Sequence, residues 1–191
     1  MSIDSARVFC TGCDYETREV YRPVRIRYQM ANGKTIETGR SKGWCFDCSG
    51  YSDIEKIDEE NLREDLVSKE RERREQRGRL LELDSGLLAG LRHRSERRRL
   101  KYSIERLDED VAELAGLLEI AKGRKARARC LKCWSDRTAP LSFDSADDVA
   151  HDFRHECGGN LKIVHDHAGP RFHFAVATYV LNEEGELLGQ E

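Results

Sequence analysis

The sequence predicts an α+β protein in which two small, cysteine-rich β modules are joined by a long, charged, antiparallel helical hairpin. All seven cysteines of the 191-residue chain lie outside residues 53–122, and this stretch also lacks proline. Its second half carries apolar residues at alternating intervals of three and four, which is typical of paired helices. The flanking segments alternate apolar and polar residues as strands do. We therefore expect three parts, at residues 1–52, 53–125 and 126–191.

The composition favours small modules that are held together by something other than a large core. Hydrophobic residues make up 38% of the chain and charged residues 36%. Small domains with thin cores need metals or disulfides to be stable. The N-terminus shows no apolar segment of a secretory signal, and no apolar run approaches the ~20 residues of a membrane span. We therefore expect a cytoplasmic protein, without a membrane partner, whose cysteines bind metal.

The first part of the chain contains two C-x2-C pairs, Cys10–Cys13 and Cys45–Cys48. Each pair can form a tight knuckle in which backbone N–H groups point at a thiolate sulfur. Two such knuckles supply four sulfur ligands for a tetrahedral Zn²⁺, and four protein ligands leave no position for a substrate. The spacing therefore predicts one structural zinc ion held by Cys10, Cys13, Cys45 and Cys48.

The segment between the two pairs predicts a β-hairpin. Apolar and basic residues alternate over residues 24–30, Asn32-Gly33 is a strong two-residue turn signal, and residues 35–38 return. The order of knuckle, hairpin and knuckle over residues 8–50 resembles the zinc-ribbon superfamily. This resemblance implies a structural zinc ion in a small β fold, and it implies no particular function.

The last part of the chain predicts a second zinc site. Cys130 and Cys133 form a third C-x2-C pair, and Cys157 is the remaining cysteine. A set of three cysteines and one histidine is a common structural zinc site. We expect His155 to be the fourth ligand of a ribbon-like module at residues 130–160, with His151, on a short helix expected at residues 145–153, as the alternative. The chain would thus hold two structural Zn²⁺ ions.

The middle of the chain predicts two helices that fold back on one another. Acidic residues from Asp53 onward suit a helix N-terminus, and Asp84-Ser85-Gly86 is a turn signal. Apolar and polar blocks mirror one another about Ser85, which favours an antiparallel hairpin. The alternative is a single long helix that dimerises between chains. The expected seam of the second helix is Leu100, Ile104, Leu107, Val111, Leu114, Leu118 and Ala121.

Two arginine-rich stretches of the arm predict a docking surface. Residues 68–79 hold six bases and three acids, and residues 91–102 hold six bases and one acid. The mirrored hairpin would place them opposite one another, and like charges do not stabilise such a pairing. We therefore expect an acidic partner there, a nucleic-acid backbone being one candidate. The rivals are a solvated surface and self-association of the arm. The belt consists of Arg71, Arg73, Arg74, Arg77, Arg92, Arg94, Arg97, Arg98, Arg99 and Lys101.

The sequence favours a non-enzymatic zinc-binding adaptor or regulator. It shows no phosphate-binding loop, dinucleotide fingerprint or catalytic triad. The arm and ribbons would dock on a larger machine, through a protein partner and in association with nucleic acid. One alternative is a direct DNA- or RNA-binding or RNA-polymerase-binding transcription regulator. Another is a metallohydrolase that uses His165, His167 and His173, because His-x-His on a strand places both rings on one face.

Overall fold

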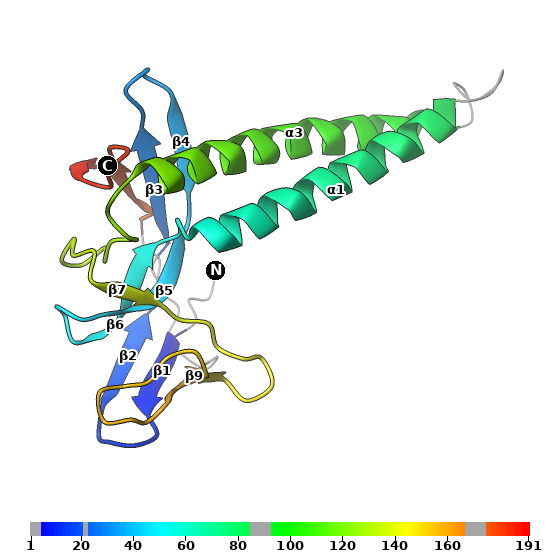
Figure 1. Ribbon diagram of the computed structural model, residues 1–191. Coiled ribbons are helices and arrows are strands. Elements are labelled where there is room, and N and C mark those ends of the chain that lie inside the picture. The colour runs from blue at the N-terminus through cyan, green and yellow to red at the C-terminus, as the bar shows by residue number, and fades with distance from the viewer. Residues whose placement is uncertain (1–4, 21–22, 85–92, 167–174) are drawn as a thin grey trace. The chain divides into compact units, whose positions relative to one another are not determined.

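The computed structural model describes residues 5–20, 23–84, 93–166 and 175–191 (Figure 1). It contains helices and small, mostly antiparallel sheets, which confirms the α+β class. None of the helices in the described part of the chain is long and apolar enough to cross a membrane. The elements are β1 (Ser5–Cys10), β2 (Glu16–Val20), β3 (Val24–Gln29), β4 (Thr35–Thr38), β5 (Arg40–Cys45), β6 (Gly50–Glu55), α1 (Glu59–Asp84), α3 (Arg94–Gly123), β7 (Thr138–Pro140), β8 (Val149–Ala150), β9 (Leu161–Asp166), β10 (Ala177–Leu181) and β11 (Leu187–Gln190).

The chain forms two compact units, and the first contains both ends of the sequence. Residues 1–56 and 124–191 make up this β unit, and residues 57–123 make up the helical unit. Among the described strands, each of the three sheets pairs a strand from before the helices with one from after them. β1 pairs antiparallel with β9, β3 pairs parallel with β10, and β5 pairs antiparallel with β7. The strand orders are β2-β1-β9-β8, β11-β10-β3-β4 and β6-β5-β7.

The predicted hairpin of β3 and β4 is present, and its alternating pattern determines which side chains are buried. Tyr28 lies opposite Ile36, and both are buried together with Ile26. Gly33 in the connecting turn has a φ of 80°, a conformation that glycine adopts without steric cost. The outward-facing Arg27 forms ion pairs with Glu37 and with Glu191 of the last strand region.

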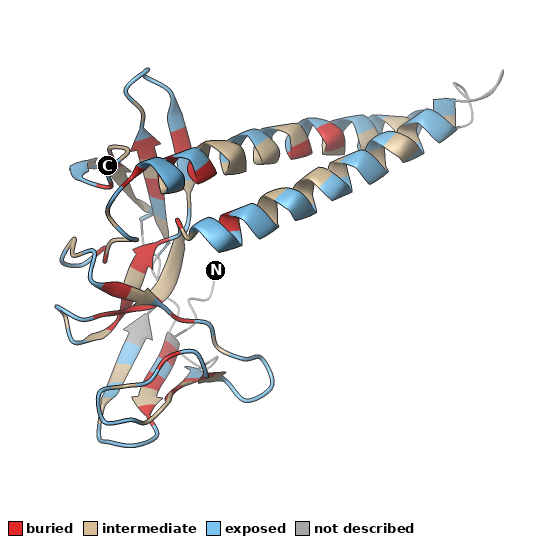
Figure 2. Ribbon diagram, in the orientation of Figure 1, coloured by how far each residue is buried: buried red, intermediate tan, exposed pale blue. Residues whose placement is uncertain are grey.

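A second part of the core lies where the sheets of β1 and β5 meet, and Trp44 is its largest buried side chain. Figure 2 shows these buried positions along the strands of the β unit. Because the members come from both halves of the sequence, neither half closes this core alone. They are Ala6, Val8, Cys10, Trp44, Tyr51, Leu141, Ala150, Phe153, Leu161 and Ile163.

Two expected helical segments are not helical, and in both cases acidic residues misled the prediction. Residues 145–153 form the short strand β8 with a turn before it, at 145–147, and another after it, at 151–152. The carboxylates of Asp144 and Asp147 accept backbone N–H groups two residues further on, as turn-forming aspartates do. Asp53 lies in strand β6, and α1 begins only after Asp58, whose carboxylate caps the helix by accepting the N–H of Asn61 at 2.9 Å.

The two helices of the second unit pack as the predicted antiparallel hairpin, but in a different register. Lys69 pairs with Asp110 at 3.3 Å, Arg73 with Asp108 at 3.1 Å, and Asp84 with Arg97 at 2.6 Å. The two residues of each pair are about equally far in sequence from residue 90, which is therefore the centre of the hairpin. The prediction placed that centre at Ser85. The predicted turn residues Ser85 and Gly86 lie outside the described residues.

The observed register corrects the expectation that like charges face one another in the arm. The basic stretch at residues 68–79 lies against the acidic middle of α3. Arg73 and Arg77 share the carboxylate of Asp108. The charges of this stretch therefore help to hold the two helices together. Ile104 and Leu107 of the predicted seam are buried.

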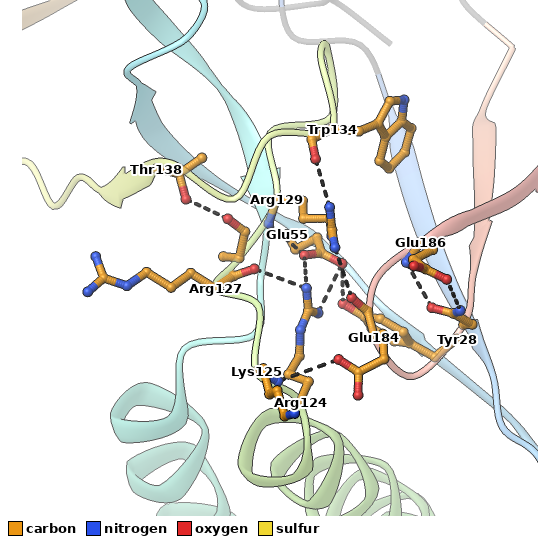
Figure 3. A network of polar contacts seen from close by, with 12 residues as sticks. Tyr28, Glu55, Arg124, Lys125, Arg127, Arg129, Trp134, Thr138, Glu184 and Glu186 are labelled. Carbon is orange, nitrogen blue, oxygen red and sulfur yellow. Dashed lines mark hydrogen bonds and ion pairs between the residues drawn. The ribbon is translucent and has the colours of Figure 1, made fainter.

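A buried ion pair lies at the two points where the chain leaves and re-enters the β unit (Figure 3). Glu55 precedes α1 and Arg124 follows α3; their side chains are 0% and 2% exposed, and Nη2 lies 3.0 Å from Oε2. The carboxylate also accepts the Tyr28 hydroxyl at 2.9 Å and the Arg129 N–H at 2.6 Å. Burial, and then the charge of Glu55, raises the pKa of Tyr28 well above its usual value.

We predict that Arg124→Ala destabilises the β unit by about 3–5 kcal/mol, because it leaves the buried carboxylate of Glu55 without its cation. The measurement is denaturant unfolding of the zinc-loaded protein, followed by the fluorescence of Trp44 and Trp134. The control is Arg7→Ala, which removes an exposed pair with Glu16 and should cost less than about 1 kcal/mol. Equal losses in the two variants would contradict this role of the buried pair.

Candidate metal centres

The eight side chains predicted to bind metal form two clusters, each with its ligand atoms within 4.8 Å of one another. Their grouping differs from the prediction. One cluster is Cys10, Cys13, His155 and Cys157, and the other is Cys45, Cys48, Cys130 and Cys133. Each cluster thus takes one pair of ligands from before the helices and one from after them. The expected sets, with Cys10 and Cys13 beside Cys45 and Cys48, are wrong.

The first cluster, site 1, joins the end of β1 to the loop that precedes β9. The sulfur atoms of Cys10 and Cys157 lie 3.3 Å apart. His155 Nδ1 lies 3.5 Å from the sulfur of Cys13 and 3.3 Å from that of Cys157. His155 is therefore the histidine of this cluster, as expected. His151, the alternative, lies 3.0 Å from Asp147 instead.

Two aromatic rings hold the imidazole of His155 in place. The ring centroid of Tyr15 lies 5.3 Å from that of His155, and Trp44 meets the imidazole edge-on at 5.1 Å and 86°. The Tyr15 hydroxyl in turn accepts the backbone N–H of Tyr51. Fixing the orientation of a histidine ligand in this way directs one ring nitrogen at the metal position.

Backbone contact between two glycines allows site 1 to close. A Cβ atom at Gly159 would lie 2.6 Å from the sulfur of Cys10 and 2.6 Å from the N of Gly12. A Cβ atom at Gly12 would lie 3.2 Å from the sulfur of Cys157. Thr11 N–H donates to the Asn160 carbonyl across the same contact, at 2.9 Å. The two loops therefore approach so closely that no larger residue fits at Gly159.

The second cluster, site 2, is built on the sheet of β6, β5 and β7. Cys45 ends β5, and Cys130 forms a bridge with Ile54 of β6. The sulfurs of Cys45 and Cys133 lie 3.5 Å apart, and those of Cys48 and Cys130 lie 4.0 Å apart. The carboxylate of Asp47 contacts Ser135 and Arg137, both at 2.6 Å, and joins the two knuckles from outside.

The backbone of the knuckles is compatible with zinc-ribbon-like sites. The N–H groups of Gly12, Cys48 and Lys132 lie 3.3–3.4 Å from the first sulfur of their knuckle. Ser49 and Trp134, each directly after the second cysteine, have φ values of 47° and 62°, which are uncommon for residues with a side chain. This backbone curls around the sulfur atoms and orients them toward a common point.

The donor sets and distances fit Zn²⁺ at both sites. A tetrahedral zinc ion with bonds of about 2.3 Å to sulfur holds its sulfur ligands about 3.8 Å apart. The observed sulfur–sulfur distances are 3.3–4.0 Å, whereas a disulfide requires about 2.05 Å. Sets of four cysteines, or of three cysteines and one histidine, are structural zinc sites without a vacant position for chemistry.

The thiols of the two clusters differ in their electrostatic environment. A hydrogen bond with His155 and one from the backbone N–H of Gly159 lower the pKa of Cys157 to about 6. Burial opposes ionisation of Cys130, yet hydrogen bonds from Ser52 and the backbone lower its pKa overall. Burial, and then the neighbouring thiols, raise the pKa of Cys48. A divalent cation would stabilise all of these thiolates, so we expect metal binding to release protons.

The observed ion pairs divide the predicted basic belt into arginines that are paired within the arm and basic residues that are not. Arg73, Arg77 and Arg97 pair with aspartates of the opposite helix, and Arg74 donates to the carbonyl of Glu70. Arg92 lies outside the described residues. The remaining members are exposed and form no ion pair in the described part of the chain; they are Arg71, Arg94, Arg98, Arg99 and Lys101.

The histidines proposed for catalysis do not form a site among the described residues. His165 lies in β9, and His167 and His173 fall outside the described ranges. A third group, Asp144, Asp147 and His151, brings two carboxylates and an imidazole together on the surface, and all three are exposed.

Sequence reasoning identified all eight candidate ligands but missed the two aromatic residues whose rings lie against His155. Tyr15 follows Cys13 by two residues and Trp44 precedes Cys45, but neither belongs to a ligand-spacing pattern. The sequence signal for the tight backbone at site 1 is its glycines, Gly12 within the Cys10–Cys13 pair and Gly159 two residues after Cys157. A comparison of the chain with known protein families, curated proteins and solved structures finds no match.

Two double variants distinguish the observed grouping of ligands from the expected one. We predict that Cys13→Ser with Cys157→Ser abolishes site 1 and leaves one zinc ion bound by four sulfurs, against two ions in the unchanged protein. Cys13→Ser with Cys48→Ser removes one ligand from each cluster and should weaken both. Elemental analysis and X-ray absorption measure the number of ions and their ligands. The opposite pattern, with a sulfur-and-nitrogen site surviving in the second variant, would restore the expected grouping.

Proposed function

We propose that this protein is a non-enzymatic zinc-stabilised adaptor that docks on a larger macromolecular assembly through its helical arm, the unit Ile57–Gly123. The observation that carries this proposal is the crossed grouping of the ligands. Cys10 meets Cys157 and Cys45 meets Cys133 across 147 and 88 residues, with the arm inserted between the two halves. Two metal ions at these sites would hold together the two halves of the β unit that the arm separates in the sequence.

The ligand sets favour a supporting role for the metals over a catalytic one. Each cluster offers four protein ligands, which satisfy tetrahedral zinc without a bound water or substrate. The rings of Tyr15 and Trp44 hold the His155 imidazole in one orientation, as expected of a structural metal ligand. Binding energy at such sites is folding energy of the module that contains them.

The helical arm offers the surface for docking. Helices α1 and α3 contain 26 and 30 residues, so each is about 40–45 Å long at about 1.5 Å per residue. Their outer positions are mostly charged, and Val67, Leu81 and Tyr102 are 58%, 71% and 62% exposed. A long hairpin with exposed anchors of this kind supports recognition of a partner surface better than it supports chemistry.

A regulator that binds nucleic acid or RNA polymerase directly is the second candidate, and the exposed arginines at the start of α3 favour it. Arg98 and Arg99 form no ion pair with any described residue. The metallohydrolase alternative stays a prediction, because His167 and His173 lie outside the described residues.

Site-specific photo-crosslinking tests the docking role of the arm. We predict that a photoreactive residue in place of Val67, Leu81 or Tyr102 captures a partner in lysate of the source cells, because these side chains are exposed on the arm. The control positions are the exposed Phe46 and Leu188 of the β unit. Samples with and without nuclease show whether nucleic acid bridges the contact. Capture from the control positions alone would contradict docking through the arm.

A further inference from the structure

We propose that the outward face of α3 near its N-terminus binds single-stranded nucleic acid. This inference rests on the proposed docking role of the arm and identifies the class of its partner. We name this surface the α3 basic face. It consists of Arg94, Arg98, Arg99, Lys101, Tyr102 and Arg106, all of which are exposed.

These six residues lie on one side of the helix. Leu100, Ile104 and Leu107 form the seam, and Ile104 and Leu107 are buried. At 3.6 residues per turn, the six members of the α3 basic face occupy a continuous arc outside that seam. The arc is therefore available to a partner while the hairpin stays closed.

The basic residues of this face form no ion pair within the described part of the chain, unlike their neighbours in the arm. The register of the hairpin neutralises Arg73 and Arg77 with Asp108, and Arg97 with Asp84. Glu96, the acidic residue nearest the start of α3, contacts His93 and none of the basic residues of the face. The five basic members of the α3 basic face form no ion pair with any described residue, so hairpin stability does not account for them.

The composition of the face fits a polyanion with exposed bases better than it fits a protein surface. The core of a protein interface is more apolar than its rim; aromatic residues, Met and Arg are enriched in interfaces, and Lys and acidic residues are depleted. Between Arg94 and Arg106 the aliphatic side chains belong to the seam, and Glu105 is the only acid on the outward arc. Guanidinium groups bind phosphate through paired hydrogen bonds. Tyr102, 62% exposed among them, offers a ring on which an unpaired base can stack.

The first test is fluorescence anisotropy of the full-length, zinc-loaded protein with a labelled mixed-sequence single strand of about 20 nucleotides and with its duplex, at salt from about 50 to 200 mM. We expect tighter binding of the single strand. The triple variant Arg98→Gln, Arg99→Gln, Arg106→Gln should reduce the magnitude of the salt slope by about two, since each phosphate contact contributes about 0.7. Tyr102→Ala should weaken binding of the single strand about five- to hundredfold with little change in that slope.

The matched control is Arg63→Gln, Arg71→Gln, Arg74→Gln, which changes the net charge equally on the exposed side of α1. It should keep the salt slope of the unchanged protein. Equal losses in the two triple variants, or no effect of Tyr102→Ala, would overturn the assignment of this face. Absence of binding at about 50 mM salt would overturn the inference altogether.

Two further outcomes separate this inference from its rivals. If light scattering shows a dimer that only the α3 triple variant dissolves, and no oligonucleotide binds, the face contacts a second copy of the chain and the inference is wrong. If arm crosslinks to a protein persist after nuclease treatment and in the α3 triple variant, the adaptor role stands and the nucleic-acid assignment fails. Oligonucleotide binding without any crosslink from the arm would instead remove the adaptor role.

Discussion

The closure of both metal-ligand clusters across the inserted arm is the constraint on which the β unit depends. Bringing Cys10 to Cys157 and Cys45 to Cys133 closes loops of 147 and 88 residues. The entropy lost on closing a loop grows only slowly with its length, so inserting a long arm adds little to this cost. The strand pairs β1–β9, β3–β10 and β5–β7 also join the two halves of the sequence. However, β7 and β8 are short, with three and two residues, and each has one partner among the described strands. Metal ligation at the two clusters would therefore supply energy that these small sheets lack.

A second interaction within the β unit brings together the points where the chain leaves and re-enters it. The chain leaves the β unit after Lys56 and returns at Arg124, and the buried pair of Glu55 and Arg124 fixes those two points beside one another. A buried ion pair gives little net stability, but it strongly disfavours arrangements that leave either charge unpaired. The pair therefore favours the arrangement in which the segments at Glu55 and Arg124 lie side by side. The hydroxyl of Tyr28 and the backbone N–H of Arg129 donate further hydrogen bonds to the Glu55 carboxylate.

The sequence predicted those parts of the structure that local chemistry determines. Knuckle spacing identified the ligands, the Asn32-Gly33 turn located the hairpin of β3 and β4, and three-four periodicity located the seam of α3. The grouping of the ligands was not predictable in this way, because all C-x2-C pairs offer equivalent sulfur atoms and spacing does not specify which pairs meet. Only the pairing of β1 with β9 and of β5 with β7 decides it, and single-sequence patterns do not encode such distant partners.

The register of the arm shows a second limit of pattern reasoning. The prediction placed polar blocks opposite polar blocks about Ser85 without regard to the sign of their charges. In the structure, residues of opposite charge face one another across the two helices. Asp108 lies between Arg73 and Arg77, and this arrangement shifts the midpoint of the hairpin toward residue 90. The exposed arginines that form no ion pair in the described part of the chain lie on both helices: Arg71, Arg74 and Arg79 on α1, and Arg94, Arg98, Arg99 and Arg106 on α3.

Cleavage of the chain within the arm tests the central claim most directly. A protease recognition sequence inserted between Asp84 and His93 yields two fragments, which carry the ligands before and after the arm respectively. Native mass spectrometry should then show both fragments in one complex with two zinc ions, and removal of zinc by a chelator should separate them. Fragments that separate while each keeps its own zinc ion would show that every ligand set is contained within one half of the chain, which contradicts the crossed sites.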